Sequence, residues 1–292
     1  MPISYIVLGA VALSLLLIRL NQRLASPLLA IVDRWLRWLV FAFAGAELCR
    51  QFGWIDRPYS VLVLCGFILW VLGETLYNWL AISALSLSPF PLFPRYILNA
   101  SGEGWPVHPR LLAVRDWLRE QGFRPVQALK AEVGGGVYLR VSVYQNPEAT
   151  LRIQVTFLPQ ANGSLTACYS LTTLAPDGTR YVTDNLYIPF GGFYPESWFV
   201  ERAPWRRSLA KLLERHRARI AARGVTPAPF AVEPLADLNS AQRELDQINT
   251  ELGFLHPHGE REDFGKITHE GRYRVWKEIW MLNYLGRAAR YH

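Results

Sequence analysis

The stretch YSVLVLCGFILWVLGETLYNWLAI, at residues 59–82, contains a single charged side chain, Glu74, among apolar and neutral residues. A helix needs about 20 such residues to cross roughly 30 Å of hydrocarbon. Pro58 directly precedes the stretch and suits the first turn of a helix, where its missing N–H is not needed. We therefore expect a membrane-spanning helix over about residues 59–83, and this expectation sets the class of the protein.

A second apolar run lies near the N-terminus and reads ISYIVLGAVALSLLLI, at residues 3–18. It carries no charge, so it predicts another span over about residues 3–20. A secretory signal peptide would place positive charge before the apolar run, whereas here Arg19 and Arg23 follow it. We therefore interpret the run as a membrane span and not as a signal peptide.

The segment between these runs, residues 27–50, can be interpreted in two ways. Its first half carries Asp33, Arg34 and Arg37, and its second half contains the apolar run 38–46. Asp33 and Arg37 stand four residues apart and can pair on one face of a helix, so the charged turns can lie at the headgroups of a spanning helix. If the segment instead lies on the membrane surface, the chain has two spans and not three.

The arginines near the expected spans predict the orientation. Counted near the ends of the spans, the first loop region has four of them, the second loop region has two, and the N-terminus has none. The four are Arg19, Arg23, Arg34 and Arg37. The positive-inside rule therefore places the first loop in the cytoplasm. With three spans, the N-terminus is outside and the chain after residue 83 is on the cytoplasmic side of the cell's inner membrane. The three cysteines form no CxxC pair, which agrees with a reducing compartment.

Composition excludes one ordinary soluble domain. The 292 residues are 51% hydrophobic and 19% charged, and the apolar excess lies before residue 90. About 200 residues remain for a soluble unit, which is enough to bury a core of its own. The formal net charge of +7 fits contact with anionic lipid, nucleic acid or an acidic protein, and it equally fits a solvated surface.

These patterns divide the chain into four parts. Residues 1–88 hold the spans, and residues 89–109, with five prolines, form a stiff juxtamembrane linker. Residues 110–223 form an α+β domain, and residues 224–292 form a second linker with a helical C-terminal tail. Helical periodicity and stop signals predict helices at 110–122, 204–223, 237–252 and 271–286.

Between residues 125 and 188 the pattern changes from a helical period to alternation, which is typical of strands. Apolar residues occupy every second position in residues 137–143, 151–157 and 165–171. Weaker runs lie at 126–133 and 179–188, and turn residues stand at 146–148, 162–163 and 176–178. We therefore expect an antiparallel meander of four to five strands, flanked by helices, with one apolar and one polar face.

Glu74 is the first candidate for a functional position, because an ionised carboxylate inside a membrane span costs a few kcal/mol. The simpler interpretation is that it faces the other helices and bonds Asn78 one turn away, or an arginine such as Arg34 or Arg37. We favour a packing or assembly role over ion or proton conduction, because three spans with one carboxylate make a poor pathway.

The expected helix 204–223 is a basic amphipathic helix with one acidic residue, Glu214. For a domain tethered to the inner leaflet, the nearest anions are lipid headgroups, to which basic clusters bind. The candidates for membrane-surface or anion contact are Arg206, Arg207, Lys211, Arg215 and Arg219. Nucleic acid is disfavoured, because no zinc-finger, RNP or helix-turn-helix signature accompanies the helix, and a merely solvated helix is the alternative.

Two further sets of residues are candidates for binding. Tyr273, Trp276 and Trp280 stand among basic residues, as in interfacial helices; alternatively they pack on the domain core or on a partner subunit. A second set occupies the expected polar face of the sheet, where it would receive a small anionic ligand or would simply be solvated. Its members are Arg140, Arg152 and Gln154.

Motifs for catalysis are not found in the sequence. There is no GxSxG, no phosphate-binding glycine loop that opens a helix, and no metal-ligand spacing, so we assign no catalytic, cofactor or metal residue. We expect a non-catalytic accessory subunit, scaffold or partner-binding module, whose partners are the lipid bilayer and a protein or a second copy of the chain. A ligand-sensing membrane effector is the alternative, and a membrane-bound enzyme is less favoured.

Overall fold

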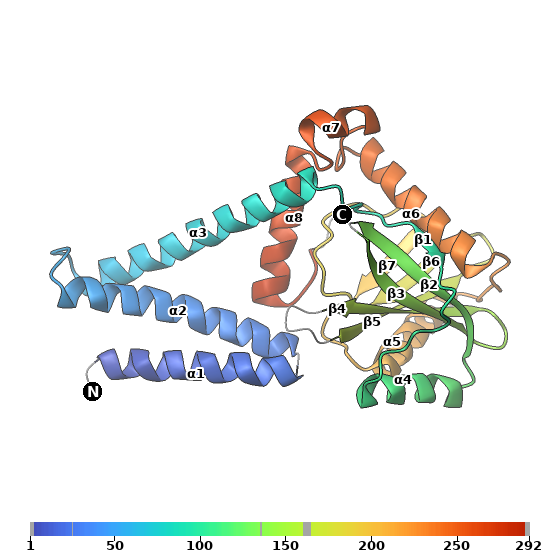
Figure 1. Ribbon diagram of the computed structural model, residues 1–292, viewed down its shortest axis with the longest axis horizontal. Helices are drawn as coiled ribbons and strands as arrows, with labels where there is room; N and C mark the ends of the chain where they lie inside the picture. The colour runs from blue at the N-terminus through green and yellow to red at the C-terminus, as the bar shows by residue number, and fades with distance from the viewer. Residues whose placement is uncertain (1–2, 25, 135, 160–164, 290–292) are drawn as a thin grey trace. The chain divides into compact units, whose positions relative to one another are not determined.

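The computed structural model describes residues 3–24, 26–134, 136–159 and 165–289 (Figure 1). The chain divides into two compact units, each made of separate stretches of sequence. We call the first the helical unit; it comprises Met1–Ala84, Pro189–Gly191 and Arg272–His292. We call the second the sheet unit; it comprises Leu85–Ile188 and Gly192–Gly271.

The helical unit is built from the N-terminal helices and the end of the chain. Its elements are α1 (Ile3–Leu24), α2 (Pro27–Gln51), most of α3 (Tyr59–Leu87), most of α8 (His269–Trp280) and a π-helical turn, η2 (Met281–Leu285). All three helices predicted before residue 84 are present. Two of them contain stretches that are long and apolar enough to cross a membrane, Tyr5–Gln22 and Tyr59–Leu87.

Small residues let α2 and α3 approach closely. A Cβ atom placed on Gly66 would lie 2.8 Å from the Cα atom of Ala42, which is closer than real Cβ contacts. Ala42, on the α2 side of this contact, is buried. Such close crossings of small residues are typical of helices that pack in lipid, where no hydrophobic effect drives them together.

The sheet unit contains a seven-stranded sheet in the described part of the chain, so the prediction of four to five strands was too low. Its strand order follows the chain, and all neighbours are antiparallel except β6 and β7, which are parallel. The strands are β1 (Tyr96–Leu98), β2 (Arg124–Gly134), β3 (Val137–Gln145), β4 (Leu151–Pro159), β5 (Leu165–Leu174), β6 (Arg180–Asp184) and β7 (Trp198–Arg202). The predicted turn at residues 162–163 lies outside the described residues.

Helices cover both faces of this sheet (Figure 1). Leucines of α4 (Pro109–Glu120) and α5 (Leu209–Ala222) pack on one face, around the buried side chains of Tyr144, Ile153 and Leu171. The other face carries Leu129, Val141 and Val143, against which α6 (Pro234–Glu251) packs. The unit ends with a short 3-10 turn, η1 (His258–Glu260), and α7 (Arg261–Phe264).

The prediction of one apolar and one polar face was wrong, and the hairpin between β3 and β4 gives the reason. Its register pairs Val143 with Gln154 and Tyr144 with Ile153. Odd-numbered residues of β3 therefore share a face with even-numbered residues of β4. Because the apolar residues of both strands are odd-numbered, the two sets point to opposite faces, and each face needs its own covering helix.

Candidate functional site

Glu74 lies within the helical unit, where it has partners from three elements. Arg34 of α2 donates a hydrogen bond to Glu74 Oε1 at 2.6 Å. The Glu74 Oε2 atom accepts one from Trp70 Nε1 at 2.9 Å and another from the Tyr284 hydroxyl. Of the partners considered from sequence, the one found is Arg34. Asn78 is buried, and its amide nitrogen makes no hydrogen bond with a described residue.

The aromatic residues of the last helix take part in packing inside the helical unit. Trp280 stacks on Tyr284 with ring centroids 4.5 Å apart, and it meets Trp38 of α2 edge-on at 6.2 Å. Tyr273 stacks on Trp276 at 5.7 Å and remains exposed. Trp280 therefore belongs to a partly buried aromatic cluster of this unit.

The basic residues around α5 differ in their exposure and in their hydrogen-bond partners. Arg206 and Arg207 precede the helix, which begins at Leu209, and Lys211 is exposed on it. Arg215 is exposed and pairs with Glu201 of β7 at 2.8 Å. Arg219 instead points back to the sheet and donates to the carbonyl oxygens of Val182, at 2.7 Å, and Phe199, at 2.6 Å. Arg219 thus holds α5 on the sheet.

The three residues expected on a common ligand face are separated by the sheet. Arg140 lies on the α4 side, where it donates to the carbonyl oxygen of Gly104 at 3.1 Å. Gln154 and Arg152 lie on the opposite side, and Gln154 donates to the Tyr96 hydroxyl at 3.2 Å. Arg152 is only 3% exposed, because α6 covers it.

Arg152 is part of a buried ionic cluster that joins α6 to the sheet. Its Nη1 atom donates to Asp237 Oδ2 of α6 at 2.5 Å, and Arg180 donates to Asp237 Oδ1 at 2.5 Å. The second terminal nitrogen of Arg152 donates to the carbonyl oxygen of Val232 at 2.8 Å, and its guanidinium lies 4.0 Å from the ring centroid of Phe230. These contacts engage the Arg152 guanidinium with structural partners.

His216 of α5 is a second buried polar group. It is 1% exposed and lies 2.9 Å from the hydroxyl oxygens of both Thr173 and Thr183, one at each ring nitrogen. Burial, helped by the nearby charges of Arg219 and Arg217, lowers the pKa of His216 to about 4. The imidazole is therefore neutral at physiological pH and bridges β5 and β6.

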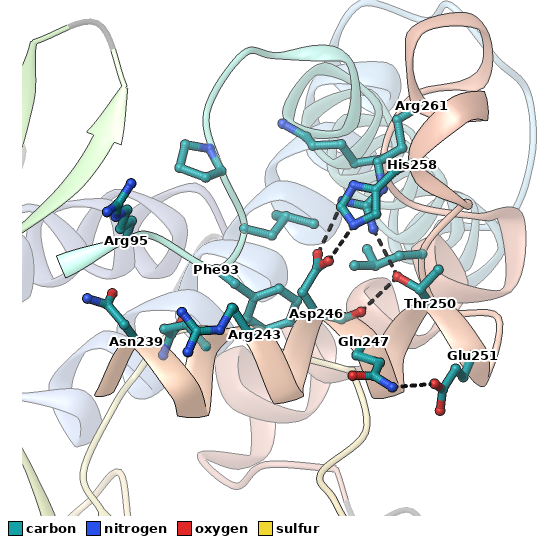
Figure 2. Close-up of a pocket in the computed structure, with 15 residues that line it drawn as sticks. Phe93, Arg95, Asn239, Arg243, Asp246, Gln247, Thr250, Glu251, His258 and Arg261 are labelled. Carbon is teal, nitrogen blue, oxygen red and sulfur yellow. Dashed lines mark hydrogen bonds and ion pairs between the residues drawn. The ribbon is translucent and has the colours of Figure 1, made fainter. Parts of the chain in front are cut away.

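A groove that the sequence did not indicate lies along the outer side of α6 (Figure 2). Its volume is about 960 Å3. One wall is the segment 91–95, the floor is α6 from Asn239 to Glu251, and the other wall is the loop 255–266. Apolar side chains of Leu92, Phe93 and Leu255 line it beside charged ones.

Figure 2 shows two groups of polar side chains in this groove. At one end, both carboxylate oxygens of Asp246 have partners. Arg261 donates to its Oδ1 atom at 3.1 Å, and His258 lies 2.9 Å from its Oδ2 atom. Arg261 also donates to the Thr250 hydroxyl at 2.9 Å. This end of the groove is therefore neutralised by its own contacts.

At the other end, Arg95 and Arg243 are exposed and have no hydrogen-bond or ion-pair partner for their side chains among the described residues. Asn239 stands beside them, and its side chain binds the backbone of Tyr96 twice, at 2.8 Å and 3.0 Å. That contact fixes the residue next to Arg95 against the first turns of α6, one turn before Arg243. Two guanidinium groups thus lie at one end of the groove, and no carboxylate in the described part of the chain pairs with them.

Lys266 adds a fourth cation to the groove, beside Arg95, Arg243 and Arg261. Its ammonium group donates to the carbonyl oxygens of Ser88 and Phe90, both at 2.5 Å. Burial and the charge of Arg261 lower the pKa of Lys266. Counted together, the lining has four Arg and Lys residues against the carboxylates of Asp246 and Glu251, which leaves two positive charges when His258 is neutral.

The excess of positive charge in the groove suits an anionic ligand. Guanidinium groups present paired N–H donors that match the oxygens of phosphate or carboxylate. Within the described residues, no group of three or more His, Cys, Asp or Glu side chains lies close enough to hold a metal ion. Comparison of the chain with protein-family models, with curated proteins and with solved structures gives no match.

Proposed function

We propose that the protein is a non-catalytic binding module anchored in the inner membrane, whose sheet unit holds an anionic partner on the cytoplasmic side. The observation that carries this proposal is the pair of unpaired guanidinium groups, Arg95 and Arg243, in a groove of about 960 Å3. Such a module would serve as an accessory subunit or scaffold. The polar groups buried elsewhere in the sheet unit, His216 and Arg152 with Asp237, have structural partners, which favours binding over catalysis.

Membrane anchoring is supported by the surfaces of α1 and α3. Only 6% of the residues in each apolar stretch are buried, which favours contact with lipid over a place in the core of a soluble fold. We propose that α2 is the third span, because its charges are compensated. Arg37 lies 3.0 Å from Asp33, the Ser14 hydroxyl donates to the same carboxylate at 2.6 Å, and Arg34 pairs with Glu74. Such pairing reduces the cost of placing charge in lipid.

A ligand-sensing effector is the second candidate, favoured by one contact. The groove-lining loop binds the last turn of α3, where Lys266 N donates to the Ser86 carbonyl oxygen and Ile267 N donates to the Ser86 hydroxyl, both at 2.9 Å. A ligand in the groove would therefore contact a loop that is hydrogen-bonded to the end of a spanning helix.

The experiment that tests the binding function is purification of the full-length protein from its native membrane in mild detergent. Mass spectrometry would identify bound proteins, lipids and small anions for the wild type, Arg95→Gln/Arg243→Gln and the control Arg119→Gln/Arg124→Gln, whose two arginines are exposed outside the groove. We expect an anionic molecule in the wild type and the control and its loss from the groove variant. The same bound molecules in all three proteins would contradict the proposal.

A further inference from the structure

We infer that the groove on α6 binds the phosphate headgroup of an anionic phospholipid from the membrane that anchors the chain. This inference rests on the function proposed above and names the ligand of the same site. It is argued from the position of the groove along the chain, from the apolar residues beside it, and from the chemistry of its free cations.

The groove begins close to the end of α3. Its first lining residue, Pro91, follows Leu87 by four residues, which extended chain spans in at most about 14 Å. The 29 residues of α3 form a helix of about 43 Å, longer than the roughly 30 Å of a hydrocarbon core. A spanning α3 therefore brings its last turns, and the groove wall that follows, to the headgroup layer.

The loop on the other side of the groove is fixed to the same helix end. Lys266 binds the carbonyl oxygens of Ser88 and Phe90, and a Cβ atom on Gly265 would lie 2.6 Å from the Ser86 hydroxyl oxygen. Gly265 has a φ of +81°, so glycine is favoured here both by conformation and by space. Both walls of the groove are thus bonded to the turn where α3 ends.

Apolar side chains surround this point and are left exposed. Leu87, Phe90 and Phe264 are 67%, 44% and 59% exposed. Leu87 at the end of α3 lies next to Gly265, and Phe264 is the residue before it. An apolar surface beside a cationic groove matches the boundary between acyl chains and headgroups, where both kinds of group are stabilised.

The lining of the groove suits an amphipathic ligand. Arg95 and Arg243 can donate paired hydrogen bonds to phosphate oxygens, and Lys266 adds a point charge. Leu92 and Phe93, on the wall nearest to the helix end, offer contact to the glycerol and the first acyl carbons. The volume of about 960 Å3 accommodates a whole headgroup. An acidic protein segment would use the cations but not this apolar wall.

The test is a titration of the detergent-solubilised full-length protein with phosphatidylglycerol or phosphatidylcholine, read by native mass spectrometry. We expect phosphatidylglycerol to bind more tightly than phosphatidylcholine. Arg95→Gln/Arg243→Gln removes two cations and should weaken binding about thirtyfold. Arg119→Gln/Arg124→Gln, which removes two exposed cations outside the groove, should leave it unchanged. Both groove arginines are exposed, so the folded state should survive; unchanged hydrogen exchange of α6 would confirm this.

Competition with inorganic phosphate distinguishes the phosphate of a lipid headgroup from free phosphate as the ligand. Retention of phosphatidylglycerol in the presence of phosphate supports a lipid ligand. Binding of phosphate without phosphatidylglycerol overturns the lipid inference but leaves the anion-binding function in place. Equal binding of phosphatidylglycerol by the wild type and the groove variant, or its loss from the control variant, overturns the assignment to the groove.

Discussion

Replacing Asp237 with alanine would test whether the buried ionic cluster holds α6 on the sheet. The carboxylate of Asp237 accepts hydrogen bonds from both Arg152 and Arg180 at 2.5 Å. In Asp237→Ala both guanidinium groups lose their carboxylate. Arg180 can relax toward solvent, since its side chain is 14% exposed and its guanidinium lies 5.0 Å from the ring centroid of Trp198. Arg152, with a side chain that is 3% exposed, cannot.

The magnitude follows from the burial of Arg152. Removing one partner of a buried pair costs about 3–5 kcal/mol, because the other charge stays desolvated and unpaired. Arg152→Met should cost less, about 1.5–3 kcal/mol, because Asp237 keeps its bond to Arg180. The order of the two variants is therefore a sharper prediction than either value.

Hydrogen exchange of the β4 amides in the detergent-solubilised full chain measures this cost. Strands in a core exchange through large openings of the unit, so a loss of 3 kcal/mol should accelerate their exchange at least about a hundredfold. Glu244→Ala is the matched control, because Glu244 is exposed on the same helix. An acceleration below about fivefold in Asp237→Ala, or a larger effect in Arg152→Met, would refute the reasoning.

Three further predictions concern other positions. The pKa of His216 is about 4 in the fold and about 6.5 in the unfolded chain, so between these pH values only the unfolded chain binds the proton. The contribution of His216 to the free energy of unfolding should therefore be fully present above pH 6.5 and fall by up to about 3 kcal/mol toward pH 4. An equally steep pH dependence of unfolding in His216→Gln would contradict this assignment. Gly66→Val should lower the melting temperature in detergent because its side chain collides with Ala42, at a cost of about 1–3 kcal/mol. Gly73→Val is the control, because a Cβ atom on Gly73 meets nothing within 4 Å. Equal melting temperatures of the two variants would count against the α2–α3 contact. Burial and the charge of Asp184 raise the pKa of Cys168 to about 11, so peptide mass spectrometry should find its alkylation at neutral pH much slower in the native protein than in denaturant, and equal rates would disprove its burial.

The strands show what the sequence could and could not predict. Alternation within 137–143, 151–157 and 165–171 correctly indicated three of them. It could not show which face each apolar set would occupy, because that depends on the register across each turn. The hairpin between β3 and β4 puts the two apolar sets on opposite faces, which only a second covering helix, α6, makes stable.

Contacts between residues far apart in the chain explain why the sequence did not predict β1, β7 and the groove. Residues 89–109 were predicted to be a linker because of their prolines, yet Tyr96 begins β1, pairs with β2 and is bonded to Asn239, which is 143 residues later. The parallel partner of β6, β7, was missed in the same way. The groove is likewise formed by segments distant in the chain, so neither Arg95 nor Arg243 stood out in the sequence.

The discontinuous helical unit has a consequence for the order of synthesis. Arg34 leaves the ribosome before Glu74 does, so this partner is present when α3 is synthesised. Tyr284 follows Glu74 by 210 residues and, at about 5–20 residues per second, appears about 10–40 s later. The sheet unit, which ends at Gly271, is translated in that interval. The part of the protein that is begun first is therefore completed last.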